Sequence, residues 1–204
     1  MNAPAVEIAS LLPVPIGAPF EGGRLAGAID VAGSIYAIVK PPIAECLHPC
    51  IVWNKSKKLV EEAYSLNDGL ANTEAMARAG SELAQWALDR KLYIPAVDEL
   101  DLVHRAFKPT TQANACWMRS GINMNSVPLA LPYTPESPTQ TEIEECREGG
   151  AEAIPAEWIW TSTQSRVSSD WAWVQGFANG GQSFYGKGLE FCAVAVRRVL
   201  IRSI

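Results

Sequence analysis

The sequence is poor in the residues and motifs that common catalytic sites require. It holds only two histidines among its 204 residues, His48 and His104, so schemes that need a histidine base have few starting points. The Gly-x-Ser-x-Gly nucleophile elbow, the complete phosphate loop Gly-x-x-x-x-Gly-Lys-Ser/Thr and the His-Glu-x-x-His zinc motif are all absent. We therefore expect a protein that is not an enzyme and that carries no cofactor.

An excess of positive charge and long apolar runs are also missing. The formal net charge is -5, which leaves no broad basic surface for a phosphate backbone, so we expect no nucleic-acid partner. No uncharged run approaches the roughly 18 apolar residues of a spanning helix, which excludes membrane insertion. The first twenty residues lack a basic start and contain four prolines, unlike a signal peptide, so synthesis in a cytoplasm is expected.

The five cysteines are odd in number and widely spaced, unlike the framework of a disulfide-rich secreted domain, and free, mostly buried thiols are expected. Cys46, His48 and Cys50 contain zinc-ligand types, but their spacing matches no known zinc pattern, and a turn with two ordinary cysteines is favoured. His104 is expected to be a hydrogen-bonded packing residue on a helix, because no partner for a general base is evident. No metal site is therefore predicted.

Prolines and small aliphatic residues make residues 1–22 an extended arm that precedes a domain over residues 23–204. Alone, such an arm frays, so it needs its own domain or a neighbouring subunit to lie on. We expect the arm to make contacts between subunits of a homo-oligomer. Its apolar side chains, which carry this expectation, are Leu11, Leu12, Val14, Ile16 and Phe20.

Hydrophobic spacing predicts a mixture of helices and strands, hence an α+β fold. Steps of three and four residues begin at Asn72, a suitable N-cap, and a second helix follows Pro95. A short helix is expected over 139–147, and residues 108–138 show no period and are read as a long irregular segment. Predicted strands are 25–31, 34–40, 51–53, 158–163, 170–177, 182–185 and 192–200, the last four as an antiparallel meander.

Aromatic residues between positions 158 and 191 alternate with Ser, Asn, Gln and Gly. Rigid rings beside small hydrogen-bonding residues are typical of recognition surfaces, because they supply contact area at low entropic cost. The alternative is that the rings form the core, which must hold for about half of them given how readily aromatic residues are buried. The predicted partner-binding residues are Trp171, Gln175, Asn179, Gln182, Phe184, Tyr185 and Lys187.

Several segments share their order and spacing with one group of proteins. They are YIPAVDEL at 93–100, WIWTST at 158–163, WAWV at 171–174 and AVRRV at 195–199, with NDGLANT at 67–73 upstream. Together they resemble an uncharacterised family of phage and prophage proteins related to the Lcl C-terminal domain. The resemblance covers about residues 23–200 and leaves the arm outside.

This resemblance implies a C-type-lectin-like domain with two main helices and a small twisted antiparallel sheet, a fold shared with formylglycine-generating enzymes and with the variable proteins of diversity-generating retroelements. It implies a non-enzymatic bacteriophage virion protein that assembles with other virion proteins, as a tail-fibre or tail-tip component that binds a host-surface protein or glycan. A structural subunit of the capsid decoration or baseplate is the alternative. Asp170 and Asn179 permit a calcium ion without requiring one.

Overall fold

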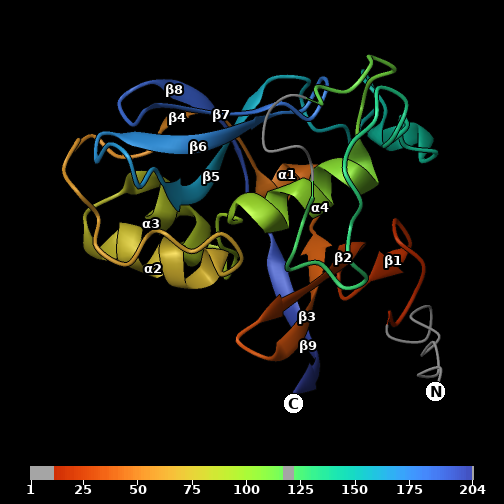
Figure 1. Cartoon of the computed structure of the whole chain (residues 1–204), viewed down its shortest axis with the longest axis horizontal. Coiled ribbons are helices and arrows are strands. Elements are labelled where there is room, and N and C mark those ends of the chain that lie inside the picture. The colour runs from red at the N-terminus through yellow and green to blue at the C-terminus, as the bar shows by residue number, and fades with distance from the viewer. Residues whose placement is uncertain (1–11, 117–121, 204) are drawn as a thin grey trace.

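The computed structural model describes residues 12–116 and 122–203, which form one mixed assembly of helices and strands (Figure 1). Most strands precede residue 53 or follow residue 157 and the three longer helices lie between them, the segregated order expected for an α+β protein. The strands are β1 (Pro19–Phe20), β2 (Gly23–Val31), β3 (Ser34–Lys40), β4 (Leu47–Val52), β5 (Trp158–Gln164), β6 (Trp171–Gly176), β7 (Gln182–Gly186), β8 (Glu190–Val194) and β9 (Arg197–Ser203). The helices are α1 (Ile43–Cys46), α2 (Gly69–Arg78), α3 (Glu82–Asp89) and α4 (Val97–Phe107).

The first sheet has the strand order β1-β2-β3-β9 and is antiparallel throughout. The β2–β3 hairpin agrees with prediction: Ala32 and Gly33 both have positive φ, and the Asp30 carboxylate accepts the Gly33 N–H at 2.7 Å. The C-terminal strand β9 pairs with β3, so the first hairpin and the last strand of the chain form one sheet. Gly27 lies under Leu102 of α4, which packs on this sheet.

The second sheet has the order β4-β8-β5-β6-β7, with β5 and β8 parallel and the other neighbours antiparallel. The prediction of one strand over 192–200 in a simple meander is wrong. The chain leaves β8 at Val194 and enters β9 of the other sheet at Arg197. Between them, Ala195 N–H donates to Cys46 and Val196 bonds Tyr93 in both directions at 2.9 Å. Because the apolar run from Cys192 to Val196 continues past the end of β8, the sequence pattern does not reveal the change of sheet.

The helix predicted to begin at Asn72 is two helices, α2 and α3. The carboxylate of Asp68 caps the first by accepting the Ala71 N–H, and Asn72 lies buried inside it. Gly80, with φ near +81°, ends the first helix, and the Ser81 hydroxyl caps the second. The helix after Pro95 is confirmed as α4. Two main helices were expected, whereas three of eight to eleven residues are present.

Residues 108–116 and 122–138 are irregular, as expected, apart from isolated bridges. The Lys108 ammonium holds them together by donating to Gln112 O, Asn114 Oδ1 at 2.7 Å and Pro138 O. The helix predicted over 139–147 is wrong, since only one 3-10 turn forms there, at Glu144–Cys146. Local capping signals were insufficient because too few residues follow to complete an α-helix.

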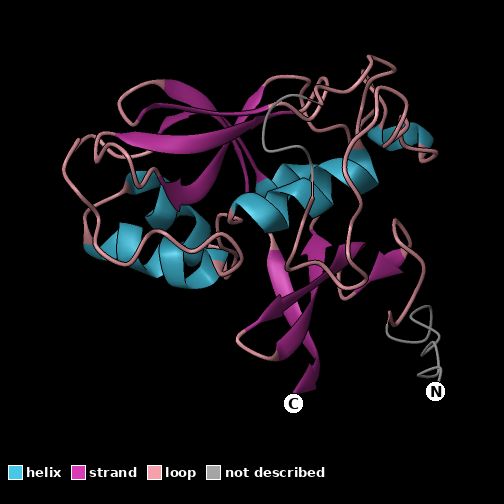
Figure 2. Cartoon of the chain, in the orientation of Figure 1, coloured by secondary structure: helices cyan, strands magenta, loops and turns pink. Residues whose placement is uncertain are grey.

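The second sheet lies over α2 and α3, and α4 runs between the two sheets (Figures 1 and 2). One apolar cluster joins these layers, which confirms the α+β class. Residues 12–22 lie along the first sheet: Gly17 N–H donates to Leu25 O at 2.7 Å, and β1 pairs with β2. Of the predicted arm residues, Leu11 lies outside the described residues, while Ile16 is exposed and Phe20 half-buried. Within the described ranges, no helix has the length and apolarity needed to cross a membrane.

Candidate functional site

The β6–β7 hairpin carries most of the predicted binding residues, but it distributes them over two ends and two faces. Trp171 and Lys187 lie at the open end, where loops 165–170 and 187–189 meet. Gln175, Asn179 and Gln182 lie at the closed end, around the turn, roughly 16 Å away at about 3.3 Å per strand residue. The seven residues therefore do not form one contiguous surface.

At the open end, rings lie on one face of the hairpin. Trp173 and Phe184 are paired in register with ring centroids 5.4 Å apart, and Trp171 lies 5.2 Å from the same Phe184 ring. Trp171 is 38% exposed, and the neighbouring loops add Val167 at 91% and Leu189 at 50%. Hydrogen bonds from Ser165 N–H to Trp171 O and from Leu189 N–H to Gly186 O hold these loops at the strand ends. This end presents apolar side chains to solvent from a rigid sheet.

Tyr185 points to the opposite face of the hairpin from Phe184, because neighbouring strand residues alternate. Its ring packs 5.6 Å from Trp158 and 5.3 Å from Phe191, and it is half-buried. Trp160, on the same face, is fully buried. The expectation that about half of the aromatic residues form core is met by this face, whereas Trp171 and Phe184 belong to the other.

Lys187 is fully buried beneath the open end, so its side chain is not available to a partner. Its ammonium donates to Lys58 O at 2.9 Å and to Gln164 Oε1, and lies 4.6 Å from the centre of the Trp53 ring. Burial lowers the pKa of Lys187 to about 8, although the Asp170 carboxylate opposes the shift. Residues 181–187 have the Gly-x-x-x-x-Gly-Lys spacing of a phosphate loop, but they form β7 and the following residue is Gly188.

At the closed end, the polar residues face a buried group instead of solvent. Gln175 is fully buried, and its Nε2 lies 3.4 Å from the Tyr133 hydroxyl and from Gly180 O. The Tyr133 hydroxyl donates to Asp101 Oδ1 at 2.6 Å and lies 2.9 Å from His104 Nδ1. Since the tyrosine proton is directed to the carboxylate, His104 Nδ1 is the donor of its pair. Gln175 and the 6% exposed Gln182 thus support the hairpin from within.

His104 is a packing residue, as predicted, although it has the partners that the sequence did not reveal. Its ring contacts Phe177 edge-on at 5.3 Å and is fully buried. Burial, with the nearby charges of Lys108 and Arg105, lowers the pKa of His104 to about 3, so the ring is neutral near pH 7. The chain Asp101–Tyr133–His104 resembles a proton relay in its residue types, but its burial keeps substrates away. Tyr133 lies in the irregular segment, whose tertiary placement no local pattern predicts.

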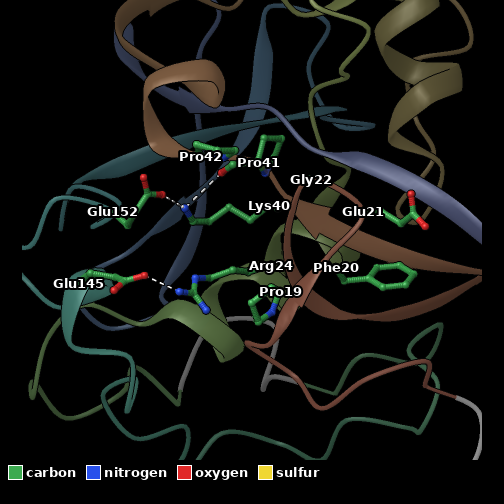
Figure 3. Close-up of a pocket in the computed structure, with 11 residues that line it drawn as sticks. Pro19, Phe20, Glu21, Gly22, Arg24, Lys40, Pro41, Pro42, Glu145 and Glu152 are labelled. Atoms are coloured by element: carbon green, nitrogen blue, oxygen red, sulfur yellow. Dashed lines mark hydrogen bonds and ion pairs between the residues drawn. The ribbon is translucent and has the colours of Figure 1, made fainter.

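A broad open pocket of about 570 Å³ lies where the arm meets the 3-10 turn (Figure 3). Arg24 and Glu145 form an ion pair across it, and Lys40 pairs with Glu152 at 2.9 Å (Figure 3). The Glu152 carboxylate also accepts the Ile43 N–H, and these partners lower its pKa against the opposing effect of burial. Because both cations already have carboxylate partners, the charges of this pocket hold its walls together.

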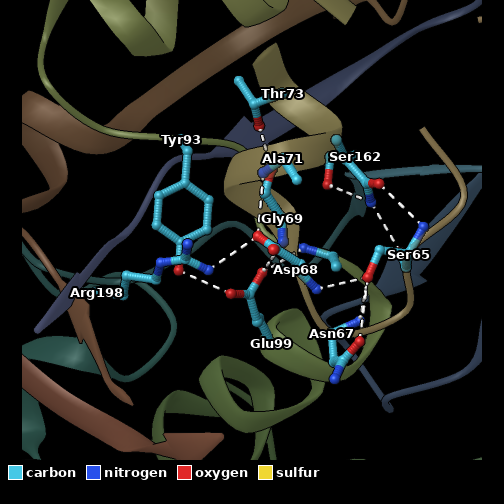
Figure 4. A network of polar contacts seen from close by, with 12 residues as sticks. Ser65, Asn67, Asp68, Gly69, Ala71, Thr73, Tyr93, Glu99, Ser162 and Arg198 are labelled. Carbon is cyan, nitrogen blue, oxygen red and sulfur yellow. Dashed lines mark hydrogen bonds and ion pairs between the residues drawn. The ribbon is translucent and has the colours of Figure 1, made fainter. Parts of the chain in front are cut away.

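A buried polar network joins α2, α4, β5 and β9 (Figure 4). Glu99 Oε2 accepts the N–H groups of Gly69 at 2.9 Å and Ala96 at 2.8 Å, and Oε1 accepts the Tyr93 hydroxyl at 2.8 Å. A Cβ on Gly69 would lie 2.2 Å from Glu99 Oε2, so only glycine fits there. Burial raises the pKa of Glu99 to about 8, despite the donors that favour its ionised form.

The same network contains four of the five segments on which the family resemblance rests. Asp68 pairs with Arg198 at 2.9 Å, and Asn72 Nδ2 donates to Ser65 O at 2.8 Å and lies 3.3 Å from the Ser162 hydroxyl. Segments 67–73, 93–100, 158–163 and 195–199 therefore converge on one buried cluster. Their polar residues fix the packing of helices against strands instead of forming an exposed site.

The structure separates Cys46, His48 and Cys50. Cys46 is buried with its thiol toward Pro41 O, whereas Cys50 is exposed beside Glu190. His48 packs edge-on against Trp86, and burial lowers its pKa. All five cysteines are free, and three of them are buried. Among residues 12–116 and 122–203, no three His, Cys, Asp or Glu side chains are grouped so as to hold a metal ion.

Comparison of the chain with protein-family models, with curated proteins and with solved structures finds no match. The candidate site is therefore defined by its own geometry: the face of the β6–β7 hairpin formed by Trp171, Trp173 and Phe184, together with Val167 and Leu189 of the adjoining loops. This set is called the aromatic end below.

Proposed function

We propose that this chain is a non-enzymatic binding protein of a bacteriophage virion, a tail-fibre or tail-tip component that attaches to a host-surface protein or glycan through the aromatic end. The observation that carries the binding role is the exposure of Trp171, Val167 and Leu189 together at one end of a sheet. Contiguous exposed apolar side chains on loops held by a rigid scaffold are typical of interaction sites. The virion assignment rests on the resemblance to phage proteins.

We further propose that the fold is C-type-lectin-like. The pairing of the first hairpin with the last strand, β3 with β9, and the second sheet built from later strands support this. The long irregular segment, which covers the closed end of the β6–β7 hairpin, fits the same architecture. Fold alone does not fix the ligand, so the binding role depends on the aromatic end.

A structural virion subunit without receptor binding is the second candidate, and a different surface favours it. The segment 122–131 exposes four large apolar side chains. They are Ile122, Met124 at 73%, Leu129 and Leu131 at 72%. Apolar surface of this kind is commonly covered by a neighbouring subunit. The arm exposes one further large apolar side chain, Ile16.

Immunogold labelling of intact particles with an antibody against this chain separates the two candidates. Label at the distal end of fibres or at the tail tip supports attachment. A regular lattice of label on the head or baseplate supports the structural role. Absence of the chain from purified particles, measured by mass spectrometry, contradicts both.

The attachment role predicts that Trp171→Ala weakens binding of the purified protein to host cells by roughly thirtyfold, since exposed aromatic anchors contribute about 2 kcal/mol or more at interfaces. Its melting temperature should change little, because the ring is at the surface. Leu200→Ala, which removes a more exposed apolar side chain on β9 (55% against 38% for Trp171), serves as the control and should bind like the parent. Equal binding by Trp171→Ala and the parent would place the binding surface elsewhere.

The arm is proposed to contact a neighbouring subunit. Deletion of residues 1–16 removes the apolar Leu11, Leu12, Val14 and Ile16 but keeps Gly17, whose N–H bonds Leu25, and the β1–β2 pairing. We expect a folded domain that no longer assembles, measured by light scattering and by incorporation into particles. Each apolar side chain buried in an interface contributes up to roughly 1.5–3 kcal/mol. A truncated protein that assembles normally contradicts this proposal.

A further inference from the structure

A second, smaller pocket lies between the C-terminal end of α3 and β9. It has a volume of about 230 Å³ and is formed by residues from α2, α3, the 91–93 segment and β9. The lining residues are Leu70, Leu88, Lys91, Leu92, Tyr93, Arg197 and Arg198. It thus combines a basic rim with an apolar wall, in a protein whose net charge is -5.

The apolar wall faces the hollow. Leu70, which packs against the core, and Leu88 are both half-buried, so part of each side chain remains open at the pocket. Leu92 and Tyr93 are buried and form its floor. Tyr93 is fixed by its hydrogen bond to Glu99, and the pocket therefore stands on the rigid network described above.

The cations are unequally engaged. Arg198 is already paired with Asp68 and stacked 4.5 Å over the Tyr36 ring. Arg197 is held loosely: one terminal nitrogen donates to Glu21 O at 3.2 Å, the other lies 4.0 Å from Glu45, and its buried Nε has no partner among the described residues.

Lys91 is exposed and makes no ion pair within the described part of the chain. Its backbone is held in a left-handed turn, with φ near +58°, by a bond from its N–H to Leu88 O. The turn thereby positions an uncompensated cation beside the leucines. Lys91 and Arg197 leave positive charge over an apolar hollow.

We propose that this pocket binds a small amphipathic carboxylate, with its charged group between Lys91 and Arg197 and its short aliphatic chain against Leu70 and Leu88. The pocket holds roughly eight heavy atoms at about 30 Å³ each, which matches a carboxylate of about six carbons. Charge complementarity selects the anion, and burial of the chain against leucine favours the aliphatic part. This site is separate from the aromatic end and does not depend on its role.

The test is NMR titration of the full-length protein with hexanoate, using hexan-1-ol and acetate as probes that each keep one half of the ligand. Hexanoate should shift the amides of Leu70, Leu88 and Arg197 with saturation in the millimolar range, about 4 kcal/mol of binding free energy. Hexan-1-ol and acetate should each bind at least tenfold more weakly. Failure of hexanoate to saturate, or equal binding of acetate, would overturn the proposal.

Variants locate the site. Arg197→Gln should weaken hexanoate binding about tenfold and Lys91→Gln about threefold, because the lysine is more exposed and its charge is better screened. Arg202→Gln removes an exposed cation from the same strand and should leave binding unchanged. Lys91 is exposed, so Lys91→Gln should fold like the parent. This variant therefore tests the site even if Arg197→Gln is unstable. Parent-like binding by the Lys91 variant and by any folded Arg197 variant would show that hexanoate binds elsewhere.

Discussion

The two ends of the β6–β7 hairpin have opposite environments. The closed end, with Gln175, Gly180 and Gln182, is covered by the irregular segment through Tyr133. The open end, with Trp171, is exposed to solvent. A polar or aromatic side chain is therefore a contact residue only where nothing else in the chain covers it. The comparison shows that coverage by the irregular segment separates the packing end from the exposed end.

The strongest test of this difference is to add one methyl group at each end of the hairpin. At Gly180, a Cβ would lie 2.3 Å from Tyr133 and 2.7 Å from His104, and φ is near +74°. At Gly186, nothing lies within 4 Å of a Cβ. Gly180→Ala should lower the free energy of unfolding by at least about 3 kcal/mol, and Gly186→Ala should change it by less than about 1 kcal/mol. Urea unfolding of both variants measures this, and equal losses would contradict the assignment of the two ends.

The next largest expected effect is the pH dependence of stability, because two buried groups, His104 and Glu99, have pKa shifts in opposite directions. In the folded protein the pKa of His104 is about 3, so only the unfolded chain gains this proton as the pH falls below 6.5, and stability is lost toward acid. The pKa of Glu99 is about 8, so the folded protein keeps a proton that the unfolded chain loses above about 4.5, and stability is lost toward alkali.

Between pH 4.5 and 6.5 the two slopes therefore oppose each other, and the parent should show a shallow dependence. His104→Gln should become less stable with rising pH, and Glu99→Gln more stable, each by up to about 1.4 kcal/mol per pH unit. The measurement is urea unfolding at several pH values within this window. His48→Gln, at a partly exposed histidine whose pKa burial also lowers, should change the slope in the same direction as His104→Gln but by less. Slopes of the same sign in the His104 and Glu99 variants would contradict the assignment.

A smaller effect is expected from removing single hydroxyl groups. Tyr133→Phe takes away the hydroxyl that joins Asp101, His104 and Gln175 at the covered end, and should cost about 1–3 kcal/mol because buried polar atoms lose a partner. Asp101 keeps Arg105 and Asn123, which limits the loss. Tyr185→Phe should lie within about 0.5 kcal/mol of the parent, because its hydroxyl makes no hydrogen bond with the described residues. If Tyr185→Phe lowered the melting temperature more than Tyr133→Phe, the assignment of the covered and exposed ends would be contradicted.

Periodic segments were predictable because their signal is local. The β2–β3 hairpin follows from two alternating runs around Ala32-Gly33, and α4 from apolar spacing after Pro95. The division of α2 from α3 was missed, although Gly80-Ser81 supplied a stop and a cap within one helical pattern. The segment 139–147 shows the converse, since caps were present but no helix follows.

The candidate site was predicted in part. The aromatic and polar stretch includes the β6–β7 hairpin, and of its predicted residues Trp171 and Phe184 lie on the aromatic end. That this end binds a partner stays a prediction. Lys187 could not be recognised as buried, because the groups that satisfy its ammonium lie at Lys58 and Gln164, far away in the sequence. The pocket beside Lys91 and Arg197 was likewise hidden, since it joins residues about one hundred positions apart.

The α+β class, most strands and α4 followed from the sequence alone, because these depend on local spacing and composition. Only the tertiary structure decided that residues 190–203 serve two sheets, that three lysines are buried among loop carbonyls and rings, and that one end of a hairpin is covered and the other exposed. The physical reason is that burial is set by whichever distant segment fills the space above a residue. Local sequence patterns contain no information about which distant segment that is.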